Sequence, residues 1–287
     1  MTDPFLAHRS LLFTVAYEML GSAADAEDVV QETWLRWADA DQSEVRDPRA
    51  YLVRIVTRQS LNRLRTLARR REDYVGEWLP EPLLTTPDVA DDVELAESVS
   101  MAMLTVLETL TPTERAVFVL REVFDVPYEE IAAALDKSTA AVRQTAHRAR
   151  EHVAARRPRR QVDRSEQRVV ERFLAALSTG DVQGLIEVLA PEVVVVADGG
   201  GLVAAARHPI AGADKVVAFL SKFAALAPTA VVDTVWLNGA LGGRIVLDGK
   251  LDTVISFVLD DGRISRMYAV RNPHKLGRLN EEAVIAR

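Results

Sequence analysis

The chain has 287 residues, no cysteine and a formal net charge of −7. The absence of cysteine excludes disulfides and thiolate metal sites, and the five histidines show no ligand spacing, so we expect neither metal nor cofactor. No apolar run approaches the ~20 residues that a membrane span requires, and we expect a cytoplasmic chain of two or three domains with no membrane contact.

The first informative segment, residues 25–37, has the pattern of an amphipathic helix. The side chains expected to face a core are Val29, Val30, Thr33, Trp34 and Trp37. The opposite, acidic and amide-bearing face contains Asp25, Asp28, Gln31 and Glu32. Such a face suits a partner helix rich in arginine. An acidic helix start favoured by the helix dipole would explain the same residues without any partner.

A basic helix is predicted next, beginning at Asp47-Pro48 and running to about residue 71. Its buried face is outlined by Tyr51, Leu52, Ile55, Val56, Leu61 and Leu64. Its exposed face carries Arg54, Arg58, Asn62, Arg63 and Arg65, followed by Arg69, Arg70 and Arg71. Arginines neutralise phosphates and stack on unpaired bases, so this face favours nucleic-acid binding.

Residues 77–98 are predicted to be a linker, because they are acidic and too rich in proline to form one helix. The stretch Trp78-Leu-Pro-Glu-Pro82 carries large apolar groups that would prefer to be buried. Thr111-Pro-Thr-Glu114 then has the form of a capping box with proline at the first helical position. A helix therefore begins there.

Residues 127–150 indicate two short helices joined by a tight turn, with Ser138 as the N-cap of the second. In the second helix, small apolar residues recur on one side, at Val142, Ala146, Ala149 and Val153. The other side presents Arg143, Gln144, His147 and Arg148. This arrangement is typical of a recognition helix in a DNA major groove. A solvated basic helix in a bundle remains the alternative.

Three segments, 25–37, 46–71 and 110–151, together resemble a bacterial sigma factor of the extracytoplasmic-function (ECF) group. The resemblance implies that residues 1–76 form the region-two domain and residues 99–155 the region-four helix-turn-helix domain. It implies that Asp25, Asp28, Gln31 and Glu32 dock on the clamp helices of the largest subunit of core RNA polymerase. It also implies −10 contacts from Arg54, Arg58, Asn62, Arg63 and Arg65, and −35 contacts from Arg143, Gln144, His147 and Arg148.

A second linker, residues 156–164, precedes an α+β segment, 165–287. Two amphipathic helices, a strand, a helix and a run of β-type segments follow one another, with turns at Asn238-Gly239, Asp248-Gly249 and Asp261-Gly262. This order predicts a curved antiparallel sheet wrapped round helices. It resembles the SnoaL-like cone fold, and the whole chain resembles the sigma-J-like ECF group, whose extension regulates the sigma domains in cis.

Three motifs carry that second resemblance: Trp78-Leu-Pro-Glu-Pro82, Asp198-Gly-Gly-Gly201 and Asn272-Pro-His-Lys-Leu276. We expect an interdomain regulatory contact formed by Trp78, Pro80, Asp198, Gly199, Gly200, Gly201, Asn272, Pro273, Lys275 and Leu276. The acid/base candidates in the cone, Asp198, His208, Asp233 and Asp252, form no recognisable pair, so we expect no enzyme.

Three functions therefore compete: a promoter-specificity subunit of RNA polymerase, an enzyme carrying a helix-turn-helix, and a stand-alone ligand-sensing repressor. The predicted polymerase-docking helix favours the first, because neither rival needs it. A small-molecule ligand in the cone cavity stays open, and promoter DNA and core RNA polymerase are the expected partners.

Overall fold

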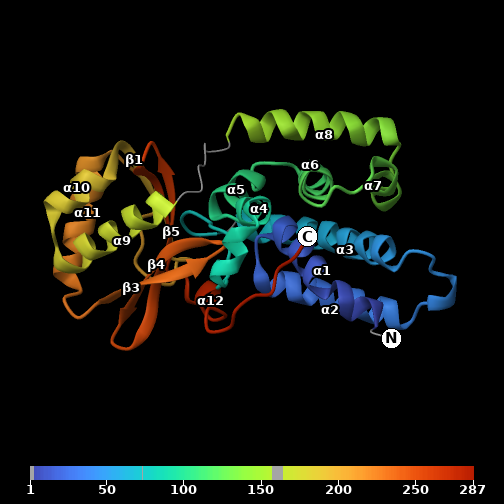
Figure 1. The fold of residues 1–287 in the computed structure, drawn as a ribbon, viewed down its shortest axis with the longest axis horizontal. Coiled ribbons are helices and arrows are strands. Elements are labelled where there is room, and N and C mark those ends of the chain that lie inside the picture. The colour runs from blue at the N-terminus through green and yellow to red at the C-terminus, as the bar shows by residue number, and fades with distance from the viewer. Residues whose placement is uncertain (1–2, 73, 157–163) are drawn as a thin grey trace.

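The computed structural model describes residues 3–72, 74–156 and 164–287 (Figure 1). The first helical domain contains α1 (Pro4–Leu20), α2 (Ala23–Ala38), a short 3-10 turn (Gln42–Glu44) and α3 (Pro48–Glu72). Gly21, in the left-handed region with φ 66°, ends α1, and the Ser22 side chain caps α2 by accepting from the Asp25 amide. These two residues turn the chain sharply, so that α1 and α2 pack side by side.

The second helical domain follows the linker and contains α4 (Val93–Ser98), α5 (Met101–Leu107), α6 (Pro112–Phe118), α7 (Tyr128–Leu135) and α8 (Thr139–Ala154). The capping box of Thr111 and Glu114 and the Ser138 N-cap are both confirmed. Two expectations differ. Helix α4 lies inside the predicted linker, capped by Asp92, and α6 passes into a π-helical segment over Val119–Val123.

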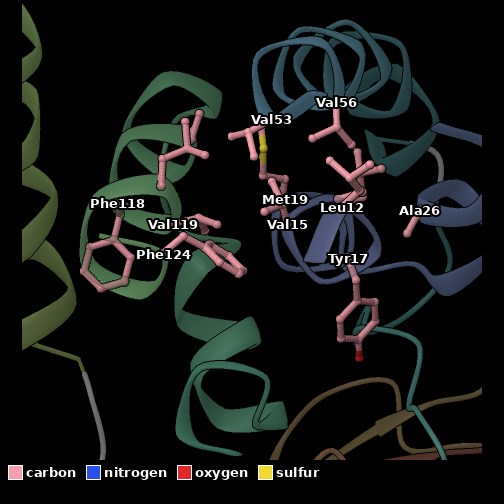
Figure 2. Packing of buried hydrophobic residues seen from close by; sticks show 14 of the residues in the cluster. Leu12, Val15, Tyr17, Met19, Ala26, Val53, Val56, Phe118, Val119 and Phe124 are labelled. Atoms are coloured by element: carbon pink, nitrogen blue, oxygen red, sulfur yellow. The ribbon is translucent and has the colours of Figure 1, made fainter. Parts of the chain in front are cut away.

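The two helical domains share one hydrophobic core. Val15 and Met19 of α1 and Val53 of α3 face Val119 and Phe124, which follow α6 (Figure 2). All five side chains are buried. The domains therefore pack directly against each other in this arrangement and cannot separate without exposing apolar surface.

The C-terminal domain, called the cone domain below (residues 164–287), begins with α9 (Arg164–Thr179) and α10 (Val182–Val188). Its strands and remaining helices are β1 (Leu189–Asp198), β2 (Ile210–Ala211), α11 (Ala213–Leu226), β3 (Val231–Leu237), β4 (Ala240–Leu247), β5 (Lys250–Asp260), β6 (Arg263–Val270) and α12 (Pro273–Leu276). Each predicted hairpin turn is confirmed, since Asn238, Asp248 and Asp261 adopt positive φ and each precedes a glycine.

The sheet has the order β2-β1-β6-β5-β4-β3. All its ladders are antiparallel except that β1 pairs with β6 in parallel. The expectation of a wholly antiparallel sheet is wrong in this one ladder. The crossover through α11 separates β1 from the β3–β6 meander, and such a crossover is what allows two strands to run in the same direction.

Both faces of this sheet are buried. Alternate residues point to opposite sides, so Ile255 and Met267 pack under α9 and α11 while Val254 and Tyr268 pack on the other face. That second face covers Leu79 of the linker. The cone thus lies with α9–α11 on its outer side and the linker, α5 and α12 on the side of the helical domains (Figure 1).

Residues 157–163, most of the second predicted linker, lie outside the described residues, as does residue 73. No helix of the described residues is long and apolar enough to cross a membrane.

Candidate DNA-binding surfaces and interdomain site

The predicted −35 face lies on the outer side of α8. Arg143, Gln144, His147 and Arg148 are exposed, above the buried seam of small apolar residues that the sequence predicts. The Arg143 guanidinium lies 5.5 Å from the centre of the Tyr128 ring and 3.3 Å from Glu129. Tyr128 was not among the sequence candidates. Its ring belongs to the first turn of α7 and holds Arg143 on the exposed side of α8.

The predicted −10 residues of α3 divide into two groups. Arg54 and Arg65 stay on their own helix, Arg54 over the Tyr51 ring at 5.2 Å and Arg65 with its Nη1 3.3 Å from the amide oxygen of Asn62. Arg63 instead contacts α2, and Arg58 contacts α7. The side chains of residues 69–71 lie outside the described residues.

Arg63 joins the predicted DNA-binding and polymerase-binding sets. Its Nη2 lies 2.6 Å from Asp25 and 2.8 Å from Asp28, both on α2. The carboxylates raise the pKa of the Arg63 guanidinium against the opposing effect of partial burial. The pair of acids predicted to face polymerase is therefore also the anchor that fixes α3 to α2.

Arg58 crosses to the helix-turn-helix. Its Nε donates to the Ala134 carbonyl at 2.8 Å and its Nη2 to the Ala133 carbonyl at 3.1 Å. Both carbonyls belong to the last turn of α7. In this arrangement a residue predicted to bind the −10 element binds the second helical domain.

The predicted polymerase face of α2 is largely exposed. Gln31 is exposed, and Glu32 accepts a hydrogen bond from Gln59 at 2.8 Å. The prediction that Trp34 faces the core is wrong. This side chain is 37% exposed, and its ring lies 5.0 Å from that of Phe5. The helical seam of Val29, Val30, Thr33 and Trp37 leaves no room for it, so Trp34 covers the rim of the core instead.

The interdomain site is built round the Asp198 carboxylate, at the end of β1, which is fully buried. It accepts hydrogen bonds from the Tyr74 hydroxyl at 2.6 Å, the Leu79 amide at 2.9 Å and the Gly200 amide at 2.9 Å. The Lys275 ammonium of α12 lies 2.7 Å away and supplies the opposite charge. Burial and the neighbouring carboxylate raise the pKa of Tyr74, so its hydroxyl keeps its proton and donates.

The other predicted residues of this site surround that carboxylate. Lys275 lies 4.1 Å from the centre of the Trp78 ring, and the Asn272 amide donates to Tyr74 at 2.8 Å. A Cβ on Gly200 would stand 2.4 Å from Asn272, which explains the glycine together with its φ of 62°. The remaining members are Gly199 and Gly201 in the same turn, Pro273 at the start of α12, and the buried Pro80 and Leu276.

A second interdomain contact has no counterpart among the sequence candidates. At the β3–β4 turn, the Asn238 side-chain nitrogen donates to the Tyr17 hydroxyl at 2.7 Å and to the Val99 carbonyl at 2.8 Å. Its oxygen accepts from the Leu83 amide at 3.0 Å. One amide thus ties the cone to α1, to the linker and to the second helical domain. The Asn-Gly pair indicated only a hairpin turn, so nothing in the sequence pointed to this contact.

The chain ends on the first helical domain. Ile285 is buried in the shared core, and the Ala286 amide donates to the Thr14 hydroxyl of α1 at 3.0 Å. Arg287 pairs with Asp92 at 3.1 Å. The C-terminal tail therefore forms a third tie between the cone and the helical domains.

The cone holds no catalytic pair among its sequence candidates. Asp198 is bound as described. Arg271 donates two hydrogen bonds to Asp252, at 2.7 and 3.0 Å. Burial would raise the pKa of the Asp252 carboxyl, but the hydrogen bonds and charge of Arg271 lower it. Asp233 pairs with Arg244 at 3.5 Å on the surface, and His208 is exposed. Across the described residues, no cluster of three or more His, Cys, Asp or Glu could hold a metal.

A cavity of about 80 Å³ lies where α5 meets α9 and the strands β3–β5. Met101, Val170, Leu241 and Phe257 contribute to its lining. Sites for small-molecule ligands usually measure ~300–1,000 Å³. This cavity is much smaller.

Comparison with known proteins agrees with this architecture. The family description "Sigma-70 region 2" matches residues 5–70, and "Sigma-70, region 4" matches residues 100–153. The ECF RNA polymerase sigma factor SigJ of Mycobacterium tuberculosis is 38% identical over 94% of this chain and 91% of its own length. A protein of the same species described as "Probable ECF RNA polymerase sigma factor SigI" is 32% identical over 96% and 94%.

A crystal structure of the M. tuberculosis ECF sigma factor SigJ superimposes with a TM-score of 0.78 at 36% identity, covering 96% of this chain and 97% of that one. The similarity therefore extends through both helical domains and the cone. The chain belongs to the ECF RNA polymerase sigma factors, which are transcription initiation factors and not enzymes.

Proposed function

We propose that this sigma factor is regulated in cis by its cone domain, which holds the two helical domains in a closed arrangement. In the open, active arrangement α2 docks on the clamp helices of core RNA polymerase, α3 binds the −10 element and α8 binds the −35 element. The protein would do so in the cytoplasm, where bacterial polymerase meets promoter DNA. The proposal assigns the cone no ligand.

The observation that carries this proposal is the buried Asp198–Lys275 pair and its partners in the linker. A buried ion pair contributes little net stability unless its geometry is good, but removing one partner is strongly destabilising. Loss of either partner should therefore destabilise the contact between the cone and the linker strongly. Tyr74 and Trp78, which bind this pair, lie directly between α3 and the second helical domain, where a cone contact can control how far apart the domains stand.

Promoter geometry gives the reason that separation matters. The −10 and −35 elements are separate segments of a promoter, so α3 and α8 must stand apart along the DNA to bind both. Here α3 touches α7 through Arg58, so both elements of one promoter cannot be bound at once. Transcription from a two-element promoter requires the closed arrangement to open.

Truncation tests the regulatory part. Removing everything beyond Gln161 exposes Leu79 and Met101 of the linker and α5, which the cone covers, and we expect lower promoter activity. Removing only residues 272–287 deletes Lys275 and Ile285 but keeps the sheet, and we expect higher activity. In vitro transcription with equal amounts of folded protein measures both. Activity equal to that of the full chain in both truncations contradicts cis regulation.

Charge changes test the promoter and polymerase surfaces. Loss of a base-reading arginine costs roughly 1–3 kcal/mol and relaxes sequence preference, so Arg143→Ala and Arg148→Ala should each weaken −35 binding. The exposed Lys222 of α11 provides the control, as Lys222→Ala. Asp28→Lys with Glu32→Lys should abolish binding to core polymerase, and the circular dichroism spectrum should stay unchanged because Asp25 keeps its own contact with Arg63. Normal holoenzyme assembly by that double variant would exclude α2 as the docking face.

A further inference from the structure

The last turn of α7 has two backbone carbonyls that its own helix does not use. Asp136 adopts the left-handed conformation with φ 54° and ends the helix. Its amide and that of Lys137 both donate to the Ala132 carbonyl. The carbonyls of Ala133 and Ala134 come after the last intrahelical donor, and such groups need a partner from elsewhere.

Arg58 of α3 is that partner. Its Nε and Nη2 donate to the Ala134 and Ala133 carbonyls at 2.8 and 3.1 Å. The guanidinium presents parallel donors to adjacent acceptors, and its positive charge lies at the negative end of the α7 dipole. This contact is a helix C-cap supplied by a different domain.

Arg58 differs from the other predicted −10 residues in the element that it contacts. Arg54, Asn62 and Arg65 make their contacts within α3, and Arg63 binds α2. Within this set, whose members all lie in the described residues, Arg58 is the one that contacts the helix-turn-helix domain.

We infer that Arg58 is a latch whose binding partner is the C-terminal end of α7, and that promoter DNA must displace α7 from it. The same two nitrogens cannot serve the α7 carbonyls and DNA together, because their N–H groups are already donated to Ala134 and Ala133. The DNA half of this inference rests on the proposed function. The latch half concerns only the closed arrangement and can be tested without DNA or polymerase.

Thiol modification can count the rare molecules in which the helical domains have separated. The chain has no cysteine, so each introduced thiol is the single reactive site. Val53 is 6% exposed and lies on the side of α3 that faces the second helical domain, whereas the fully buried Val56 faces Leu12 of α1 (Figure 2). Val53→Cys therefore reports domain separation, and Val56→Cys reports unfolding of the first domain alone.

The rate of thiol modification is proportional to the open population when closing is faster than labelling. We expect Arg58→Ala, and equally Arg58→Asn, to raise the modification rate in the Val53→Cys background about five-fold. That corresponds to ~1 kcal/mol at ~1.4 kcal/mol per tenfold, the strength of a cation at a helix C-terminus. The rate in the Val56→Cys background should stay unchanged. Arg65→Ala is the matched control, since Arg65 is exposed on the same helix.

Two results would overturn the latch. If Arg58→Ala leaves the modification rate of the Val53→Cys thiol unchanged, the carbonyl contacts do not hold the domains together. If it accelerates modification equally in the Val53→Cys and Val56→Cys backgrounds, Arg58 stabilises the first domain as a whole. Neither result depends on whether the cone regulates transcription, so the failure of the latch and that of the proposed function are distinguishable.

Discussion

The Asp198–Lys275 pair allows a quantitative test of how the cone is attached. Lys275→Met keeps the apolar stem of the side chain and removes only the ammonium group. Asp198 is fully buried and retains three donors, from Tyr74, Leu79 and Gly200. Breaking a buried ion pair costs about 3–5 kcal/mol, and three remaining donors place the loss near the lower limit. We therefore expect the unfolding free energy to fall by about 3 kcal/mol.

Urea unfolding followed by circular dichroism and by tryptophan fluorescence measures this loss, because Trp78 lies against Lys275. Lys250→Met, at an exposed position in the β4–β5 turn, is the control and should change stability by less than about 0.5 kcal/mol. Adding Asp198→Asn to Lys275→Met should recover roughly 1–2 kcal/mol, since the buried charge disappears although the Leu79 amide loses its acceptor. A loss below about 1 kcal/mol in Lys275→Met, or a double variant no more stable than the single one, would refute this reasoning.

Two further predictions concern buried groups between the domains. Glu18 of α1 is fully buried, with its carboxyl 2.7 Å from the hydroxyl of Ser98 on α4. Burial raises the pKa of Glu18 from 4.5 to about 8, so the folded chain keeps a proton that the unfolded chain releases. The unfolding free energy should therefore fall as pH rises from about 5 to 8, by at most ~5 kcal/mol, and Glu18→Gln should flatten that profile; an identical slope in the variant assigns it to another group. Asn238→Ala should cost about 2–3 kcal/mol more in urea unfolding than Asp248→Ala, a turn residue with a similar φ but an exposed side chain. The loss of the Asn238 amide leaves the Leu83 amide and the Val99 carbonyl without that partner and removes a donor to the Tyr17 hydroxyl. Equal losses in these two variants would show that only the turn conformation matters.

Local sequence patterns predicted most of the elements, because their causes are local. The Thr111–Glu114 capping box, the Ser138 cap and the three Asn-Gly or Asp-Gly turns each depend on a few adjacent residues. The parallel β1–β6 ladder depends on where a crossover returns, which no adjacent residue determines. Trp34 illustrates the same limit, since helical periodicity alone does not say how wide the buried stripe of α2 is.

The interdomain site could be predicted in part. Large apolar groups in a linker and a glycine-rich turn are unusual, and Trp78, Asp198 and Lys275 do meet. Tyr74 and Asn238 could not be found in this way, because a tyrosine after a helix and an asparagine in a hairpin are ordinary. Their roles depend on partners more than 100 residues away in sequence.

Arg58 and Arg63 show why a surface charge pattern does not fix what the charges bind. An arginine can bind DNA, a pair of carboxylates or a helix C-terminus. In the closed arrangement Arg63 binds a pair of carboxylates and Arg58 binds the C-terminal end of α7. A DNA-binding face can therefore be occupied within its own protein without any change in its sequence signature. The predicted −35 face of α8 stays exposed in the same arrangement, so the two predicted promoter-binding surfaces differ in accessibility.

The shared hydrophobic core determines what must open the closed arrangement. Separating the helical domains exposes part of Met19, Val53, Val119 and Phe124, and full exposure at about 1.5–3 kcal/mol each sets an upper limit of roughly 12 kcal/mol. Thermal fluctuation alone rarely supplies several kcal/mol, whereas any complex with a nanomolar Kd releases ~12 kcal/mol. If, as proposed, the closed arrangement must open before core polymerase is fully bound, the free energy of opening is subtracted from the affinity that is measured. Each contact that closes the chain, whether the Arg58 latch, the Asn238 amide or the Asp198–Lys275 pair, then weakens polymerase binding by the amount it stabilises the closed form. Under the proposed function, the cone domain would thus set sigma activity from a distance, without touching DNA or polymerase.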